Sequence, residues 1–238
     1  MDECGAWQLC DGSILRRMSD VVRDLHRQAD SVDLDSALQE LTMNAAKLVP
    51  GAACAGITVS RRSGYMQTIA ATDRYPVVLD EIQRGCQEGP SVSPTLNDDI
   101  VRVNDLRTDD RWPQYSRAAI ANTPIRAMMS FQLFAHRPNA AALNLYAEEA
   151  NAFGEDSVTL GQVFAVYVAL TWSLLQSAQE FRKGLASRDT IGQAKGILME
   201  RFDINAAAAF DLLKQRSQES NTPLVSLAQR LTELERSC

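Results

Sequence analysis

The amino-acid sequence predicts an α+β domain, with an antiparallel sheet and flanking helices, followed by an all-α unit of three helices. Short segments with strand patterning alternate with turns between residues 52 and 146, and helical patterning precedes and follows them. Residues 156–201 continue with helical patterning and contain no proline. The charge also changes near residue 182, because the chain from Arg182 onward has a net charge of +2 and the remainder −8.

Two amphipathic helices are expected before the sheet. The segment Ser13–Ala29 has apolar residues at helical spacing, and the segment Leu34–Val49 repeats the pattern. Asp33 is the expected N-cap of the second helix, and “VPG” at residues 49–51 ends it.

The first strands form a predicted hairpin. The segments “AACAGITVS” and “GYMQTIAAT” are its two strands, joined by Arg61–Gly64 with Gly64 at the turn. A short helix over residues 77–85 and the loop “CQEGPSVSP” are expected to follow.

Three more strands and one helix complete the predicted domain. “DIVRVNDL” is a compact strand, and “RTDDRWPQYSRAAIAN” is a loop that opens into a helix with Pro113 in its first turn. Strands near Ala127–Ala135 and Ala140–Tyr146 are joined by the turn “HRPN”.

A long helix is expected to run from near Asp156 to about Arg201, after the cap “FGED”. A second helix starts after Asn205 and is expected to turn Ala209, Phe210 and Leu213 inward. “ESNTP” ends it, and “LVSLAQRLTEL” forms a third helix.

The expected domains are residues 1–33, an N-terminal helix and linker, then 34–176 and 177–238, joined by a continuous signalling helix. The last unit is too small for a large core of its own, so we expect it to need the long helix or a partner copy.

Composition excludes several kinds of site. Five cysteines without a C-x-x-C pair and two histidines indicate neither a zinc site nor a disulfide framework, and they suit a reducing cytoplasm. Asp2 and Glu3 stand where a secretory signal would be basic, so no such signal is expected. The uncharged segment Val158–Leu175 is interrupted by polar residues, which favours a buried or dimer-facing helix over a membrane span.

The C-terminal segment resembles the ANTAR domain of bacterial transcription antiterminators. The residues that carry the resemblance are “TIGQAKGILMER”, then “AAFDLL”, then Ser217, Asn221, Leu224 and Ala228, over roughly residues 180–236. Acidic residues that are common before the “AF” pair are replaced here by Ala206, Ala207 and Ala208.

Residues 34–175 resemble a GAF domain of the type fused to ANTAR domains in actinobacteria. The residues that carry this resemblance are “LVPGAACAGITV”, “DEIQRGCQEGP”, “VNDLRTDDRWPQYSRAA” and “ALNLYAEEANAFGED”. Ser91 stands where related sequences are expected to have a cysteine, and “TPIRAMMS” replaces a “G-x-R-S” pattern. Pocket chemistry that depends on that cysteine is therefore not expected, although Cys86 lies five residues earlier.

The ANTAR resemblance implies an RNA-binding homodimer that grips two stem-loops and favours an antiterminator hairpin over a terminator. RNA is recognised through phosphates, unpaired bases and shape, so Lys/Arg and small polar groups off the apolar stripe are the candidates. The candidate RNA-binding residues are Arg188, Gln193, Lys195, Gly196, Arg201, Lys214, Arg216, Asn221 and Thr222.

Two glycines flank Lys195 inside this helix, at Gly192 and Gly196, and each costs roughly 1 kcal/mol relative to alanine. Their spacing favours the close approach of a partner, either a neighbouring helix or RNA. The spacing does not fit the P-loop pattern, and the segment does not follow a strand.

The GAF resemblance implies a small-molecule or redox sensor with a cavity between sheet and loops. The candidate pocket residues are Cys54, Cys86, Trp112, Tyr115, Met128 and Phe131. The cyclic-nucleotide pattern, a chromophore Cys–His pair and heme-ligand spacing are absent from the sequence, so no cofactor is expected and the effector is an unknown small molecule, if one exists.

An enzyme is not expected, because the paired acids Asp98–Asp99 and Asp109–Asp110 lie in loops without a partnered histidine or metal cluster. We predict a cytoplasmic protein that binds RNA, with no membrane or DNA partner. Two alternatives stay open. One is a sensor or dimerisation scaffold without RNA binding. The other is a DNA-binding regulator, although “LVSLAQRLTEL” opens with apolar rather than base-contacting residues.

Overall fold

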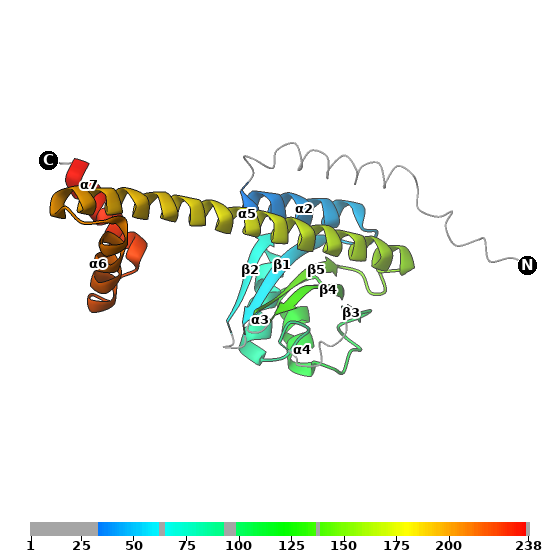
Figure 1. The fold of residues 1–238 in the computed structure, drawn as a ribbon. Coiled ribbons are helices and arrows are strands. Elements are labelled where there is room, and N and C mark those ends of the chain that lie inside the picture. The colour runs from blue at the N-terminus through cyan, green and yellow to red at the C-terminus, as the bar shows by residue number, and fades with distance from the viewer. Residues whose placement is uncertain (1–32, 62–64, 93–98, 137–138, 237–238) are drawn as a thin grey trace, which may run out of the picture. The chain divides into compact units, whose positions relative to one another are not determined.

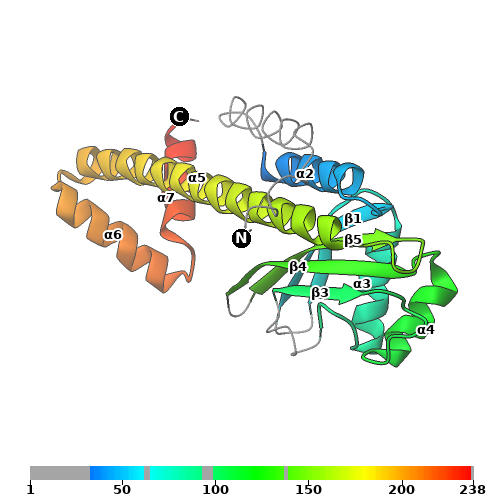
Figure 2. The same cartoon turned by 90° about the vertical axis from the view of Figure 1, so that its right-hand side faces the viewer.

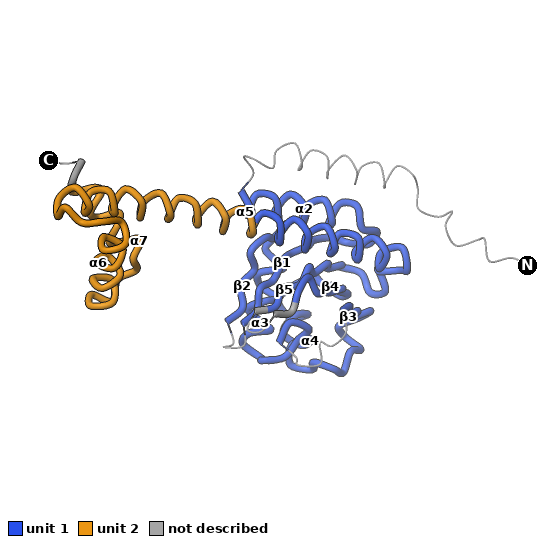
Figure 3. Tube along the Cα trace, viewed as in Figure 1, with its two compact units in different colours: residues 1–175 blue, residues 176–238 orange. Residues whose placement is uncertain are grey.

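The computed structural model describes residues 33–61, 65–92, 99–136 and 139–236 (Figure 1). Within them the predicted fold class is confirmed: a five-stranded antiparallel sheet with helices precedes an all-α C-terminal part. The predicted helix Ser13–Ala29 lies outside the described residues. The chain divides into two compact units at Leu175/Gln176, and Figure 3 colours them separately.

The sheet has the strand order β2-β1-β5-β4-β3, and every neighbouring pair is antiparallel. The strands are β1 (Cys54–Arg61), β2 (Met66–Ala71), β3 (Ile100–Val103), β4 (Ala127–His136) and β5 (Asn139–Ala147). The predicted hairpins β1–β2 and β4–β5 are thus present. The central place belongs to β5, which pairs with both β1 and β4 and joins the two hairpins into one sheet.

Each face of the sheet is covered by two helices (Figures 1 and 2). Helices α2 (Leu34–Leu48) and the first part of α5 (Glu155–Phe202) cover one face, and α3 (Tyr75–Cys86) and α4 (Pro113–Asn122) cover the other. Because strand side chains alternate between faces, the domain has two apolar cores, one on each side of the sheet.

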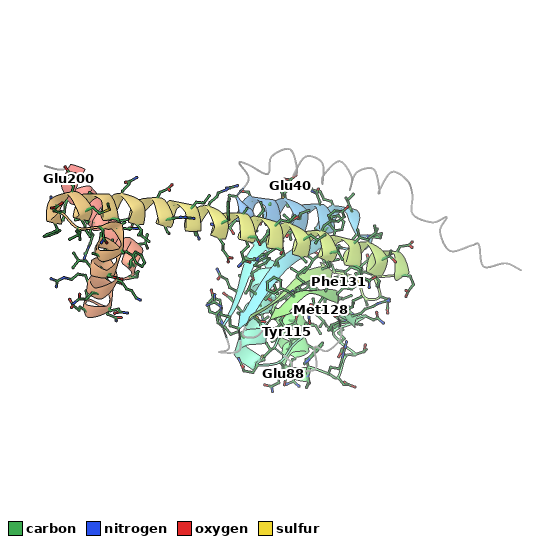
Figure 4. All side chains as sticks on the ribbon, in the orientation of Figure 1. Glu40, Glu88, Tyr115, Met128, Phe131 and Glu200 are labelled. Atoms are coloured by element: carbon green, nitrogen blue, oxygen red, sulfur yellow. The ribbon has the colours of Figure 1, made fainter. Side chains whose placement is uncertain are left out.

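Local sequence explains where these helices begin. Asp33 caps α2 by accepting from the backbone N–H of Asp35 at 3.0 Å, as predicted. Pro113 occupies the first turn of α4, where a missing N–H costs nothing. Glu88 from the “EGP” loop (Figure 4) then accepts from the backbone N–H of Gln114 at 2.8 Å, which supplies the carboxylate that this helix start favours.

Helix α5 packs closely on the sheet at Gly161. A Cβ added there would lie 2.3 Å from Cζ of Phe131, so only glycine allows this ring to reach the helix. Among the described residues, α5 is the one helix long and apolar enough to cross a bilayer by length and composition. Its Phe164 and Val168 are buried in the sheet core, whereas 28% of the apolar segment as a whole is buried.

The C-terminal unit contains the end of α5, α6 (Ala206–Glu219) and α7 (Leu224–Arg236). Asn205 caps α6 as predicted, accepting from the backbone N–H groups of Ala207 and Ala208 at 3.1 and 3.0 Å. The fully buried core of the unit is small, as expected, and consists of Ala194, Leu198, Ala209, Leu213 and Ala228.

Candidate nucleic-acid interface and sensor cluster

An open hollow on the C-terminal unit brings together three of the nine candidate RNA-binding residues. Arg188, Gln193 and Lys195 line it, and its volume is about 740 Å³. We call it the lysine hollow; its other lining residues are Gly184, Ser187, Asp189, Ile191, Gly192 and Phe210. All but Phe210 come from α5, which presents them on the side next to its buried Ala194–Leu198 face.

Lys195 is held at the hollow by an aromatic ring. Its Nζ lies 5.8 Å from the ring centroid of Phe210 on α6, within the range of a cation–π contact. Lys195 is accordingly half-buried, whereas Arg188 is exposed as expected. The prediction that Phe210 points inward is wrong, because its side chain is 40% exposed.

The two glycines that flank Lys195 have open space beside them in the part of the chain that the structure describes. A Cβ added at Gly192 or Gly196 would meet no atom within 4 Å, and both residues are exposed. Within the described residues no other helix of the chain packs on these glycines, so the predicted partner, a neighbouring helix or RNA, would come from outside. The surface remains open to a partner from outside.

A second hollow of about 790 Å³ holds two more candidates. Arg201 and Arg216 lie at an apolar groove between the end of α5, α6 and α7, whose other lining residues are Leu198, Phe202, Ile204, Ala208, Leu212, Leu213, Leu227 and Leu231. Arg216 also pairs with Glu219 at 3.2 Å. The structure thus places four of the five cationic candidates in two separate hollows of the unit.

The remaining candidates line neither hollow. Lys214 is exposed on α6. Asn221 has a left-handed backbone with φ 47°, which asparagine tolerates better than most residues, and the hydroxyl of Ser217 donates to the carbonyl of Thr222 at 2.6 Å. Asn221 and Thr222 therefore have a structural part in the α6–α7 turn.

The candidate sensor residues do not all gather in one place. Cys54, Trp112, Tyr115 and Met128 belong to the core between the sheet and α3/α4, whereas Phe131 belongs to the opposite core (Figure 4). The prediction that Phe131 lines the same pocket is corrected, because Phe131 lies three residues after Met128 in β4 and strand alternation turns it to the other face. Cys86 is half-buried at the end of α3 and is not part of that core.

Tyr146 joins this cluster, and sequence reasoning missed it. Register places Tyr146 of β5 directly between Cys54 of β1 and Met128 of β4, and the hydroxyl of Tyr115 contacts Sδ of Met128 at 3.5 Å. The hydroxyl of Tyr146 is buried and has no hydrogen-bond partner among the described residues. Burial raises the pKa of Tyr115 and of Tyr146 above the usual tyrosine value, so both are neutral donors.

A buried polar network lies beside this cluster. Asp80 of α3 accepts from the hydroxyls of Thr58 and Thr68 at 2.7 and 2.6 Å, and the amide of Asn144 donates to Thr58 Oγ1 at 2.8 Å. Burial raises the pKa of Asp80 to about 6 in spite of the two hydroxyl donors. The signal that would have placed Asp80 inside is its helical spacing of four residues from Pro76, which is buried on the same face of α3.

Cys54 is an unreactive thiol. Burial, with smaller effects from Asp73 and Glu148, raises its pKa to about 12. Since the thiolate is the nucleophile in thiol redox chemistry, this residue is a core side chain rather than a redox centre.

Two family models match the chain. Residues 31–173 match the GAF domain and residues 179–231 match the ANTAR domain. A comparison with curated proteins found no match.

Solved GAF domains resemble the first unit. The phycoerythrobilin-bound GAF domain of a cyanobacterial phytochrome is 18% identical, with a TM-score of 0.52, over 73% of this chain and 99% of that one. The phycocyanobilin-bound GAF domain of a cyanobacterial phytochrome is 19% identical, with a TM-score of 0.50, over 73% and 98%. The GAF domain of an Acinetobacter phosphoenolpyruvate-protein phosphotransferase is 12% identical, with a TM-score of 0.50, over 68% and 95%. At these identities the likeness shows the fold alone.

Proposed function

The chain belongs to the GAF domain family and carries an ANTAR domain after it, and on this basis we propose that it is an RNA-binding transcription antitermination regulator. Both domains are of regulatory types. In this proposal the ANTAR domains of a homodimer bind two stem-loops of a nascent transcript and prevent termination, and the GAF domain supplies the signal. The observation that carries it is the lysine hollow, where Lys195 and Arg188 stand beside an exposed aromatic ring.

The chemistry of the hollow suits RNA better than it suits duplex DNA. Ammonium and guanidinium groups pair with phosphates, and an amide such as that of Gln193 both donates to and accepts from a base edge. These groups surround a concave surface rather than the start of an exposed helix that would enter a major groove. Unpaired loop bases are the part of RNA that proteins read by sequence.

The charge of Lys195 tests this proposal. Lys195→Glu is expected to weaken binding to a two-hairpin RNA by at least about tenfold and to lower the salt slope of log K by about 1, because one phosphate contact is lost. Gel shift and fluorescence anisotropy at several salt concentrations measure both quantities.

Lys183→Glu is the matched control, because Lys183 is exposed on the same helix and lies outside the hollow. Equal RNA binding by Lys195→Glu and wild type would show that the RNA face lies elsewhere. Absence of RNA binding by the wild type would favour the dimerisation scaffold, and preference for duplex DNA would favour the DNA-binding regulator.

The glycines beside Lys195 test how closely RNA approaches. Gly192→Ala and Gly196→Ala are each expected to stabilise the helix by about 1 kcal/mol, since no atom of the chain opposes the new methyl group. Both are expected to weaken RNA binding about tenfold, a loss of about 1.4 kcal/mol, because the methyl group holds the RNA backbone away. Thermal unfolding and RNA titration separate the two effects.

Gly85→Ala in α3 serves as the comparison, because an added Cβ there also meets no atom within 4 Å. That variant gains stability without a change in RNA binding. Full RNA affinity in both the Gly192 and Gly196 variants would rule out a close RNA approach at this face.

For the sensor we propose that a small polar molecule acts on the core between the sheet and α3/α4. Tyr146 and Asn144 each hold a buried polar atom without a partner among the described residues, and such atoms are normally satisfied. Tyr115, Trp112, Met128 and Cys54 surround this place, with Cys86 near the end of α3. The high pKa of Cys54 argues against a redox signal at that thiol.

We propose a cytoplasmic location, with 34–176 and 177–238 as the two domains and α5 as the signalling helix between them.

A further inference from the structure

Phe210 has an environment that the rest of its unit does not explain. The buried positions of α6 are Ala209 and Leu213, which stand four residues apart on one helix face. Phe210 follows Ala209 by about 100° around the helix, so its ring lies beside the core rather than in it. With 40% of its surface exposed, part of the ring remains available to a partner.

The ring faces polar groups rather than an apolar patch. Lys195 Nζ lies 5.8 Å from its centroid, and the lysine hollow that it lines also contains Arg188, Gln193 and Asp189. Gly184 and Gly192 leave two places in the α5 wall of the hollow without a side chain. The hollow therefore offers a flat aromatic face, two cations and two groups that accept hydrogen bonds within about 740 Å³.

We propose that Phe210 stacks an unpaired nucleobase of the bound RNA, an inference that rests on the proposed RNA-binding function. A base has an aromatic face, a polar edge and a phosphate on each side, and each has a counterpart in the hollow. The phosphates pair with Lys195 and Arg188. The base edge is met by Gln193 and by the carboxylate of Asp189, which accepts from exocyclic amino groups.

Asp189 helps to decide between a nucleotide and a simpler anion. A carboxylate in the hollow repels phosphate, so a site for a bare phosphate or polyanion would be better without it. The same carboxylate favours a ligand that carries amino or imino N–H donors as well as phosphates. An unpaired loop nucleotide meets both requirements, whereas a paired stem exposes no face for Phe210 to stack on.

The test uses the full-length chain and a two-hairpin RNA selected from a pool randomised in both loops. Stacking on an aromatic side chain contributes a factor of about 5 to 150 per base, so Phe210→Leu is expected to weaken binding within that range. Leucine keeps the residue apolar and of similar bulk, and thermal unfolding checks that the unit is still folded. Phe210→Trp, which keeps an aromatic face, is expected to bind within a few-fold of the wild type.

A double-mutant cycle identifies the stacked base. Each loop nucleotide is replaced in turn by an abasic residue, and each RNA is titrated with the wild type and with Phe210→Leu. At one position the losses of binding free energy caused by the abasic change and by Phe210→Leu are expected to be non-additive, because both changes remove the same contact. 2-Aminopurine at that position is expected to be quenched by the wild type and much less by Phe210→Leu.

The outcomes separate this inference from the function it rests on. Wild-type binding that Lys195→Glu weakens and Phe210→Leu leaves unchanged would overturn the stacking and retain the RNA function. If the effects of Phe210→Leu and of the abasic change on affinity are additive at every loop position, the stacking is overturned as well. Phe210 would then contact protein rather than a base. If the wild type binds no RNA, both proposals fail together.

Discussion

Replacing Leu170 and Leu174 by glutamate is expected to turn the proposed homodimer into a monomer and to weaken its proposed binding to a two-hairpin RNA by about 100-fold or more. These leucines are 55% and 69% exposed on α5, and Val166 is exposed one turn before them. The segment from residue 157 to 179 has no charged side chain. An exposed apolar row of this kind on a long helix is expected to be covered in the functional protein.

We expect a second copy of the chain to cover it. In a symmetric dimer the same patch is used twice, so each leucine faces apolar residues of the other α5. The same helix exposes Phe181 and Leu185 further along, again at helical spacing. ANTAR domains typically dimerise, and the proposed binding of two stem-loops uses two ANTAR domains. Glutamates in such a seam would be unpaired and desolvated next to their own copies.

The affinity loss follows from avidity. A dimer that holds two hairpins gains a factor of about 10² to 10⁴ from the second contact, and a monomer loses it. Sedimentation equilibrium measures the dimer, and titration with one-hairpin and two-hairpin RNAs measures the coupling. The one-hairpin affinity is expected to be unchanged, because Leu170 and Leu174 lie outside the lysine hollow.

Gln176→Glu with Gln179→Glu is the matched control, since both residues are exposed on α5 and the change adds the same charge away from the leucine row. A dimer that survives the leucine changes would show that another surface pairs the copies. A monomeric wild type would indicate that a different occupant covers the row, and the predicted helix Ser13–Ala29 is one such segment.

The second large effect is expected at Asp80. The free energy of unfolding of the wild type is expected to fall by on the order of 3 kcal/mol between about pH 4 and pH 6. Asp80→Asn is expected not to show this fall, because asparagine does not titrate. Asp80 is buried, and burial raises its pKa to about 6, against about 3.9 for an aspartate in the unfolded chain. The stated free energy corresponds to this difference between the folded and unfolded pKa values, at about 1.4 kcal/mol for each pH unit.

The sign follows from which state holds the proton. The folded protein binds a proton at Asp80 more tightly than the unfolded chain does, so protonation favours folding. This contribution is fully present below about pH 4 and is lost as the pH rises through about 6, where the folded carboxyl ionises. Above that pH the buried carboxylate accepts hydrogen bonds from neutral groups: the hydroxyls of Thr58 and Thr68 and, at 3.3 Å, the amide of Gln83.

Urea unfolding of the wild type and of Asp80→Asn at intervals from pH 4 to pH 8 measures this effect. The difference between the two free energies of unfolding is the relevant quantity, because other titrating groups cancel in it. Glu81→Gln is the control, since Glu81 is the exposed acid next to Asp80 on α3. A difference that does not change with pH would mean that Asp80 is ionised throughout the range.

Much of the fold follows from short-range signals in the sequence. Apolar spacing predicted all the helices and strands from Leu34 onward, and Asp33, Pro113 and Asn205 marked helix starts that the structure has. Such signals succeed because a cap or an amphipathic period depends on residues within a few positions of one another. The GAF and ANTAR resemblances are borne out by the family models over the same two regions.

The composition of the candidate sites depends on contacts between segments that are distant in the sequence, and short-range signals carry no information about such contacts. The order β2-β1-β5-β4-β3 brings Cys54, Tyr146 and Met128 into one row, and it depends on the pairing of β1 with β5, which joins Cys54 to Tyr146, 92 positions later in the chain. The face of the sheet to which Phe131 turns follows from the register within that sheet. A sequence pattern can state that a side chain is apolar, but not which of two cores receives it.

The same distinction applies to Lys195 and Phe210. Their spacing in the chain placed Lys195 off the apolar stripe and wrongly placed Phe210 in the core. The packing of α5 against α6 through Ala194, Leu198, Ala209 and Leu213 sets the rotation of each helix, and this rotation leaves the ring outside, under the ammonium group. Local periodicity therefore determined the helices and strands, and motif resemblance indicated the family, while contacts between distant segments decided which side chains meet at the hollow.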